Sequence, residues 1–186
     1  MATDSSSPAA DAAAATEVER FEVLNREAKT NDLVKNHVMM ASAASLVPLP
    51  LLDVAAITGV QLRLIAKLAQ LHGKSFSENA ARNTIAGLVG GVFGHGAGIL
   101  TAISVTKFIP GFGWMLGAVS LPVVAGASTY ALGRVYARHF ESGGSVYDIS
   151  VDSVRAYYNE QLKKGRRLAR VVGEQMGGES NASQSA

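Results

Sequence analysis

Residues that could support catalysis are few in this sequence, and none of them completes a known motif. Gly73-Lys74-Ser75 resembles the end of a phosphate-binding loop, but Leu68 stands where that loop needs its first glycine. Gly126-Ala-Ser128-Thr-Tyr130 resembles a nucleophile elbow, but Tyr130 replaces the second glycine. The sequence has no cysteine, and its four histidines lack the spacing of metal ligands. We therefore expect no catalytic, cofactor or metal site, and a protein that is not an enzyme.

Basic side chains gather in one short segment near the C-terminus, at Lys163, Lys164, Arg166, Arg167 and Arg170. Such a cluster beside an apolar segment can contact anionic lipid head groups, and in other contexts it binds nucleic acid. No nucleic-acid-binding motif accompanies it. We interpret it as a solvated helix face with lipid contact as a secondary role, and expect no nucleic-acid partner.

The middle of the chain contains two segments without charge, residues 83–106 and 108–133, on either side of Lys107. As helices rising ~1.5 Å per residue, each could cross a hydrocarbon core of about 30 Å. The aromatic-rich turn between them contains Pro110 and Gly111 and is typical of a membrane interface. Because positive residues flank both segments, we expect a membrane protein with both termini in the cytoplasm. A soluble bundle with a buried hairpin is the alternative.

Glycines recur at four-residue spacing in both uncharged segments, among Gly87, Gly90, Gly91, Gly94, Gly98, Gly113 and Gly117. In lipid, small residues at this spacing let a second helix approach closely. In water, each glycine would cost a helix about 1 kcal/mol relative to alanine. The pattern predicts a close-packed helical hairpin, with packing between its two arms slightly favoured over packing between protomers.

The whole pattern predicts an all-α, membrane-associated protein in which amphipathic helices flank the hairpin. Pro48 and Pro50 break the N-terminal helices, and Asp53 follows in the first turn of the next helix, where its charge complements the helix dipole. Five segments result: a disordered tail over 1–16, N-terminal helices with the proline break over 17–82, the hairpin over 83–138, a loop and basic helix over 139–176, and a disordered tail over 177–186.

Four groups of residues, in this order, resemble a known family: Leu46-Val-Pro48-Leu-Pro50-Leu-Leu-Asp53 with Gln61 and Leu71-His72-Gly73, Phe108-Ile-Pro110-Gly111-Phe-Gly113, Ser128-Thr-Tyr130-Ala-Leu-Gly133 to Tyr136, and Phe140-Glu-Ser-Gly143-Gly144. The family is that of the YcjF-like bacterial membrane proteins, domain of unknown function 697, and the resemblance covers about residues 34–144. It implies an all-helical domain in a bacterial membrane, which we expect to be the inner membrane, and such domains often occur fused to, or encoded beside, a P-loop GTPase. The acidic N-terminal tail and the basic C-terminal helix depart from it.

These observations favour a non-enzymatic membrane adaptor or scaffold that acts with a partner. Since the chain has no GTPase motif of its own, a P-loop GTPase would have to be a separate protein. The alternative is a self-assembling membrane protein, in which a homo-oligomer forms a channel or remodels the bilayer. The glycines would then pack protomers against one another.

The uncharged segments generate a first prediction. Alkaline carbonate washing of membranes that contain the protein should leave it in the pellet, because apolar segments inserted in lipid are not released by high pH. Immunoblotting of pellet and supernatant measures the distribution. Quantitative release into the supernatant would instead favour the soluble bundle.

Overall fold

The computed structural model describes residues 8–45, 52–92 and 113–182, and within them it contains helices and no strand. This confirms the all-α prediction. The helices are α1 (Pro8–Ala44), α2 (Leu52–Leu71), α3 (Glu78–Val92), α5 (Gly113–Glu141) and α6 (Val151–Ala182). Several predicted residues lie outside the described residues: Pro48, Pro50, Gly94, Gly98, Pro110 and Gly111.

The outer helices are longer than the sequence patterns predict. Residues 8–16 belong to α1, so the expectation of a disordered tail is wrong there; alanine, the best helix former, dominates this segment. Thr16 lies inside this helix and donates a hydrogen bond to the Ala12 carbonyl at 2.9 Å. Residues 177–182 likewise continue α6, because the glycines at 177 and 178 weaken a helix without ending it.

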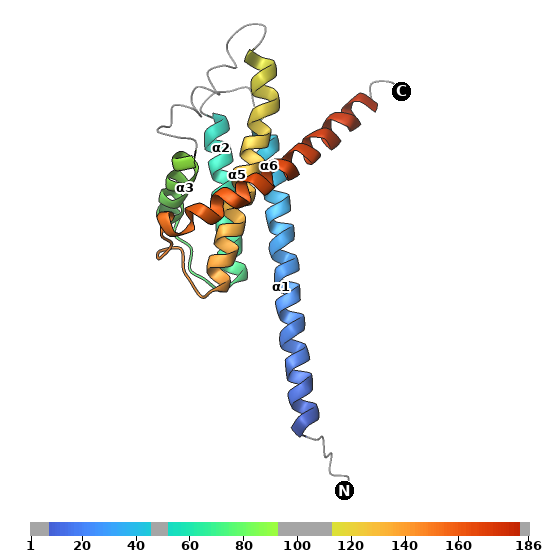
Figure 1. Ribbon diagram of the computed structural model, residues 1–186, viewed down its shortest axis with the longest axis vertical. Coiled ribbons are helices and arrows are strands. Elements are labelled where there is room, and N and C mark those ends of the chain that lie inside the picture. The colour runs from blue at the N-terminus through green and yellow to red at the C-terminus, as the bar shows by residue number, and fades with distance from the viewer. Residues whose placement is uncertain (1–7, 46–51, 93–112, 183–186) are drawn as a thin grey trace.

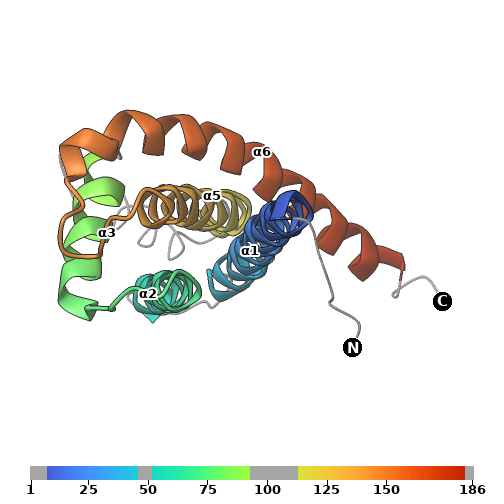
Figure 2. The same cartoon turned by 90° about the horizontal axis from the view of Figure 1, so that it is seen from below.

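The helices form a bundle around α5, which packs against α1, α2 and α6 (Figures 1 and 2). The C-terminal part of α1 lies beside α2 and α5, and α6 crosses the outside of the bundle. α3 packs chiefly on α2 and α6. The largest fully buried side chains are Val34, Val38, Leu64, Ile65, Leu68, Leu88, Leu132, Val135, Tyr136, Val146 and Tyr158. Burial raises the pKa of Tyr136 to about 12.

Two helices end in the same glycine-dependent turn. Gly73 after α2 and Gly143 after α5 have φ values of 64° and 91°, which glycine adopts without strain. In each turn the amide of the glycine and the amide of the residue after it donate hydrogen bonds to carbonyls in the last turn of the helix. One example is the bond from Lys74 N to Ala69 O at 2.8 Å. Lys74 Nζ then donates to the Gly143 carbonyl at 2.7 Å. The two turns are therefore tied together at one end of the bundle.

Three glycines allow the helices to cross closely. A Cβ at Gly126 would lie 2.6 Å from Ser42 Oγ on α1, and one at Gly133 would lie 2.8 Å from Val34 on the same helix. A Cβ at Gly165 on α6 would lie 2.8 Å from the Ala127 carbonyl oxygen on α5. Ser42 also donates to the Pro122 carbonyl at 3.1 Å. Close helix contact therefore occurs mainly between α1, α5 and α6.

Parts of both uncharged segments are buried in this bundle. Ile85 and Leu88 belong to the core, as do Leu121 and Leu132. Packing between helices thus accounts for the lack of charge over these parts. Among the described residues, one helical segment, Val54–Leu71, is long and apolar enough to cross a membrane, but the core helix of a soluble protein can pass the same test. Residues 93–112, the middle of the predicted hairpin, lie outside the described residues.

The crossing at Gly165 predicts a measurable asymmetry between two glycines. Gly165→Ala should lower the stability by about 1–3 kcal/mol, because the added methyl group overlaps the backbone of Ala127. Gly59→Ala should raise it by about 0.5–1 kcal/mol, since Gly59 is exposed on α2 with nothing near its Cβ position. Thermal unfolding followed by circular dichroism measures both. Equal effects of the two substitutions would contradict the close crossing.

Candidate functional site

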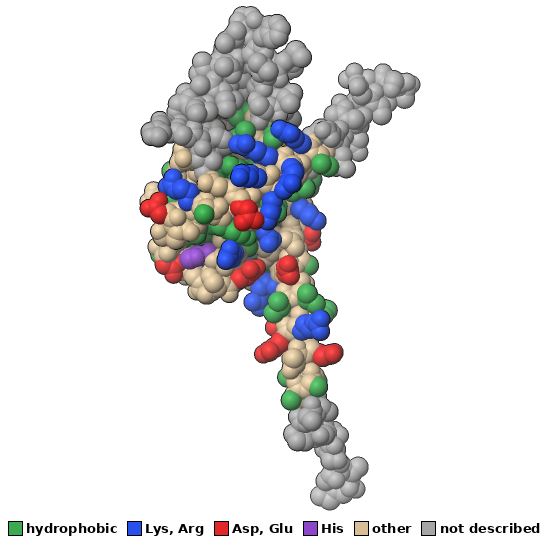
Figure 3. All heavy atoms as spheres, viewed as in Figure 1, with side chains coloured by type: hydrophobic (Ala, Val, Ile, Leu, Met, Phe, Trp, Pro, Cys, Tyr) green, Lys and Arg blue, Asp and Glu red, His purple; other side chains and the backbone are tan. Residues whose placement is uncertain are grey.

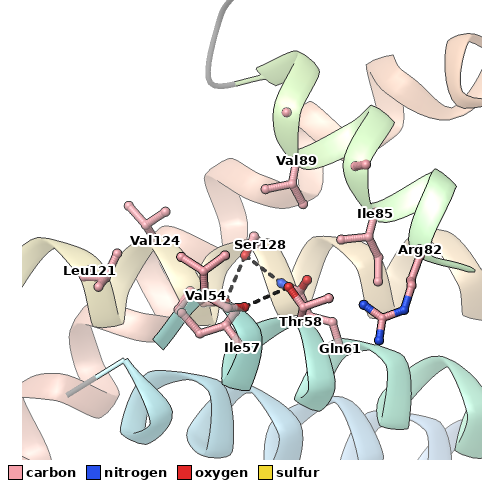
Figure 4. A pocket seen from close by; sticks show the side chains of 13 residues that line it. Val54, Ile57, Thr58, Gln61, Arg82, Ile85, Val89, Leu121, Val124 and Ser128 are labelled. Carbon is pink, nitrogen blue, oxygen red and sulfur yellow. Dashed lines mark hydrogen bonds between the residues drawn. The ribbon is translucent and has the colours of Figure 1, made fainter. Parts of the chain in front are cut away.

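A cavity of about 460 Å³ lies between α2, α3 and α5, within the size range of small-molecule sites (Figure 4). Its wall is mostly apolar and comes from all three helices. The lining residues are Val54, Ile57, Thr58, Gln61, Arg82, Ile85, Ala86, Val89, Gly90, Leu121, Val124, Ala125 and Ser128. The cavity separates α3 from α5, so the two do not pack against each other along it.

Polar groups in the cavity wall are bonded within the protein. Buried Gln61 donates from Nε2 to Ser128 Oγ at 3.1 Å and to Thr129 Oγ1 at 3.3 Å. Ser128 donates in turn to the Ala125 carbonyl, and Thr58 to the Val54 carbonyl (Figure 4). An amide buried among apolar residues requires such partners. The network therefore joins α2 to α5 and leaves the wall with a mainly apolar character.

Arg82 brings the only formal charge among the lining residues that the structure describes. Figure 4 places it at one end of the cavity, with Leu121 and Val124 toward the other end. Its Nε and Nη2 both donate to Glu78 Oε1, at 3.0 and 2.7 Å. Both side chains are about half exposed, and an exposed pair of this kind stabilises a helix by only ~0.3–0.5 kcal/mol. The pair is thus easily rearranged.

The basic cluster lies on the solvent side of α6. Lys163, Lys164, Arg166, Arg167 and Arg170 are all exposed, and Figure 3 shows blue side chains gathered along this helix. The opposite side of α6 carries Tyr158, Leu162 and Gly165 into the bundle. Lys164 pairs with Glu160 at 2.7 Å, which lowers the pKa of that carboxyl. The predicted solvated basic face is therefore present.

The N-terminal part of α1 projects from the bundle as a single helix (Figure 1). Every residue from Ala12 to Lys29 is exposed. Val18, Phe21 and Leu24 lie on one side of the helix and are 58, 70 and 56% exposed. A contiguous apolar surface of this kind marks an interaction site more often than scattered apolar residues do. We call residues 12–29 the α1 arm.

The predicted packing glycines have different surroundings. A Cβ at Gly87 would meet Val151, and one at Gly91 would meet Arg155, so both face α6 and not the second arm of a hairpin. Gly90 has nothing within 4 Å of its Cβ position because it lines the cavity. Gly113 and Gly117 begin α5. Packing between hairpin arms stays a prediction for the glycines outside α3.

The other predicted residues have structural roles where they are described. Asp53 is the second residue of α2, in the first turn as expected. Tyr130 is half-buried, with its Cβ beside Gly165, and Gly133 lies against Val34. Neither the cavity nor the partners of Gln61 were predicted from the sequence. The available signals were a glutamine among the apolar residues of α2 and a Ser-Thr pair in an uncharged helix.

No cluster of three or more His, Cys, Asp or Glu side chains that could hold a metal ion occurs among the described residues.

Fold and surfaces define an all-α domain with a projecting arm, a basic helix face and an apolar cavity. The chain belongs to the family called domain of unknown function 697 (DUF697), whose model matches residues 9–176. The match includes nearly all of α1 and most of α6, so these segments are not departures from the family.

The chain is also similar to magnetosome membrane protein 22 of Magnetospirillum gryphiswaldense. The two are 52% identical over 149 residues, which cover 80% of this chain and 76% of the relative. No solved structure matches the chain.

The hydrogen bonds that Gln61 donates to Ser128 and Thr129 can be tested by substitution. Gln61→Met should lower the free energy of unfolding by about 1–2 kcal/mol, because Ser128 and Thr129 lose a buried donor. Gln70→Met, at an exposed glutamine of the same helix, should change it by less than ~0.5 kcal/mol. Urea denaturation measures both. In the double variant with Ser128→Ala the losses should be less than additive, and full additivity would contradict a bond between the two side chains.

Proposed function

We propose that this protein is a membrane-associated adaptor that holds a partner protein near the bilayer through the α1 arm. The arm itself is the observation that carries the proposal. Its apolar side chains pack on nothing in the described bundle, and a projecting helix with such a stripe suits docking into a groove of another protein. Acidic and basic residues share its remaining surface with Val23 and several alanines, and these charges help to keep the arm soluble when the partner is absent.

Membrane association is supported by the relative and by the uncharged sequence. The relative is named a membrane protein of the magnetosome, and the same location is proposed for this chain. Bundle packing accounts for the lack of charge at the start of the first uncharged segment and at the end of the second. The remaining uncharged residues are 93–106 and 108–120, which are 14 and 13 residues on either side of Lys107. Helices of that length would rise about 20 Å, less than the hydrocarbon core. We therefore propose insertion from the cytoplasmic side without a full crossing.

The basic face of α6 supports the same orientation. Five exposed cations on one helix would lie against anionic head groups, each contributing about 1 kcal/mol near a charged surface. The partner proposed for the α1 arm is a P-loop GTPase, because the family resemblance associates such domains with one. The alternative, self-assembly, is favoured by the same apolar stripe, which a second copy could cover.

Photo-cross-linking tests the adaptor function. A photo-reactive residue in place of Phe21, in the full chain in native membranes, should give adducts with a P-loop GTPase that mass spectrometry identifies. Leu24→Asp should reduce their yield about tenfold, because a charge replaces an apolar contact. The matched control is Val23→Asp, since Val23 is 60% exposed but lies on the opposite side of the arm.

Three results would count against this proposal in different ways. Adducts between two copies of the chain would favour the self-assembling alternative. Equal effects of Leu24→Asp and Val23→Asp would show that the apolar stripe is not the contact surface. The absence of any adduct at position 21 would overturn the arm as a docking site.

A further inference from the structure

We propose that the cavity between α2, α3 and α5 binds one acyl chain ending in an anionic group, with Arg82 holding the anion. This site is separate from the α1 arm and does not depend on how the chain recruits a partner. The ligand class, a single fatty chain with a carboxylate or phosphate at its end, follows from the wall and from the position of its one charge.

The wall favours a hydrocarbon chain over a polar ligand. Its side chains are valine, isoleucine, leucine and alanine for most of its extent. The hydroxyl of Thr58 and the amide of Gln61 already donate within the protein, so they offer a ligand little. The cavity is open to solvent, since Val54, Arg82 and Ala86 on its wall are exposed, and its volume of about 460 Å³ is in the range of small-molecule sites. Methylene groups, which need no hydrogen bonds, fit this wall.

The charge lies where the head group of such a ligand would lie. Arg82 stands at one end of the cavity, and the apolar side chains of Leu121 and Val124 extend toward the other (Figure 4). Glu78 engages Nε and Nη2 of the guanidinium, while Nη1 has no partner among the described residues. A guanidinium carries five N–H donors and can bind two anionic groups at once. A carboxylate or phosphate could therefore join or displace Glu78, whose side chain is largely exposed.

Gly90 supplies the means to close the cavity without disturbing the bundle. It lines the cavity on α3, and a Cβ at this position meets nothing within 4 Å. Gly90→Leu should therefore fill the space where the chain would lie, and leucine also favours the helix over glycine. Gly59 on α2 offers a matched control: it has the same open surroundings, but its side faces solvent and does not line the cavity.

Photo-labelling with a diazirine-bearing C18 fatty acid tests the site in membranes that contain the full chain. Label should appear on peptides carrying Ile85, Val89, Leu121 or Val124. Gly90→Leu should reduce it about tenfold, and Gly59→Leu should leave it unchanged, since the loss of several buried methylene contacts exceeds 1.4 kcal/mol. Circular dichroism of both variants confirms that the helices remain. Equal labelling of the two variants would overturn the site.

The corresponding diazirine alcohol, which lacks the charge, tests the role of Arg82. Arg82→Gln should reduce labelling by the acid about tenfold and leave labelling by the alcohol unchanged, because it removes charge-assisted hydrogen bonds. Arg63→Gln, at an exposed arginine of α2 outside the cavity, should affect neither. If Arg82→Gln changes both probes equally, or neither, the anion site is wrong.

The bound acyl chain could belong to a free fatty acid or to a phospholipid. In living cells fed the same probe, mass spectrometry of the adduct distinguishes the two. A free fatty acid and an anionic phospholipid carrying the probe differ in mass, and either adduct, lost with Gly90→Leu and Arg82→Gln, supports the proposal. Label that lacks this dependence shows contact with bulk lipid only and overturns it. Carbonate extraction of the same membranes reports membrane insertion independently.

Discussion

The close crossing of α5 with α1 and α6 is the contact on which the bundle depends. At Gly126 both α1 and α6 lie close to α5: a Cβ there would lie 2.6 Å from Ser42 on α1 and 3.2 Å from Ala169 on α6. Gly133, two turns further along, repeats the contact with α1 on the same side of α5. A side chain at either glycine would separate the helices by the width of a methyl group or more. Both neighbours would then lose their fixed positions.

The fixed positions of α1, α5 and α6 also determine the surroundings of α3. This helix has no comparable contact with α5. α3 is held by α2 and α6, where Gly87 and Gly91 lie against Val151 and Arg155. With one side of α3 fixed in this way, the distance from its other side to α5 is set by the rest of the bundle. Along the cavity the two helices do not pack directly, and the cavity is the space between them. The glycine crossings and the cavity are thus parts of one arrangement.

Local signals in the sequence predicted the local features well. Gly73 follows α2 and Ser77 precedes α3, and these residue types are typical of a helix end and a helix start. The φ of 64° at Gly73 and the 3.4 Å contact from the Ala80 amide to Ser77 Oγ agree with these roles. The pairing of helices was not predictable in this way. Glycine spacing shows that a helix can be approached closely, but it does not identify the approaching helix. The interpretation therefore centred on the glycines from Gly87 to Gly117, whereas Gly126 on α5 and Gly165 on α6 also make close crossings between helices. The cavity depends on these pairings and carried no signal of its own.

The two ends of the molecule differ in what they expose. At one end, the paired turns at Gly73 and Gly143 are joined by Lys74, and the α1 arm extends beyond the bundle on this side (Figure 1). At the other end, α5 begins with residues that carry no charge, and the apolar end of the cavity lies toward them. A membrane on this second side would leave the arm free to reach about 27 Å, the rise of its 18 exposed residues, beyond the bundle on the side away from the bilayer. Attachment and recruitment can then occur at once, since neither surface covers the other.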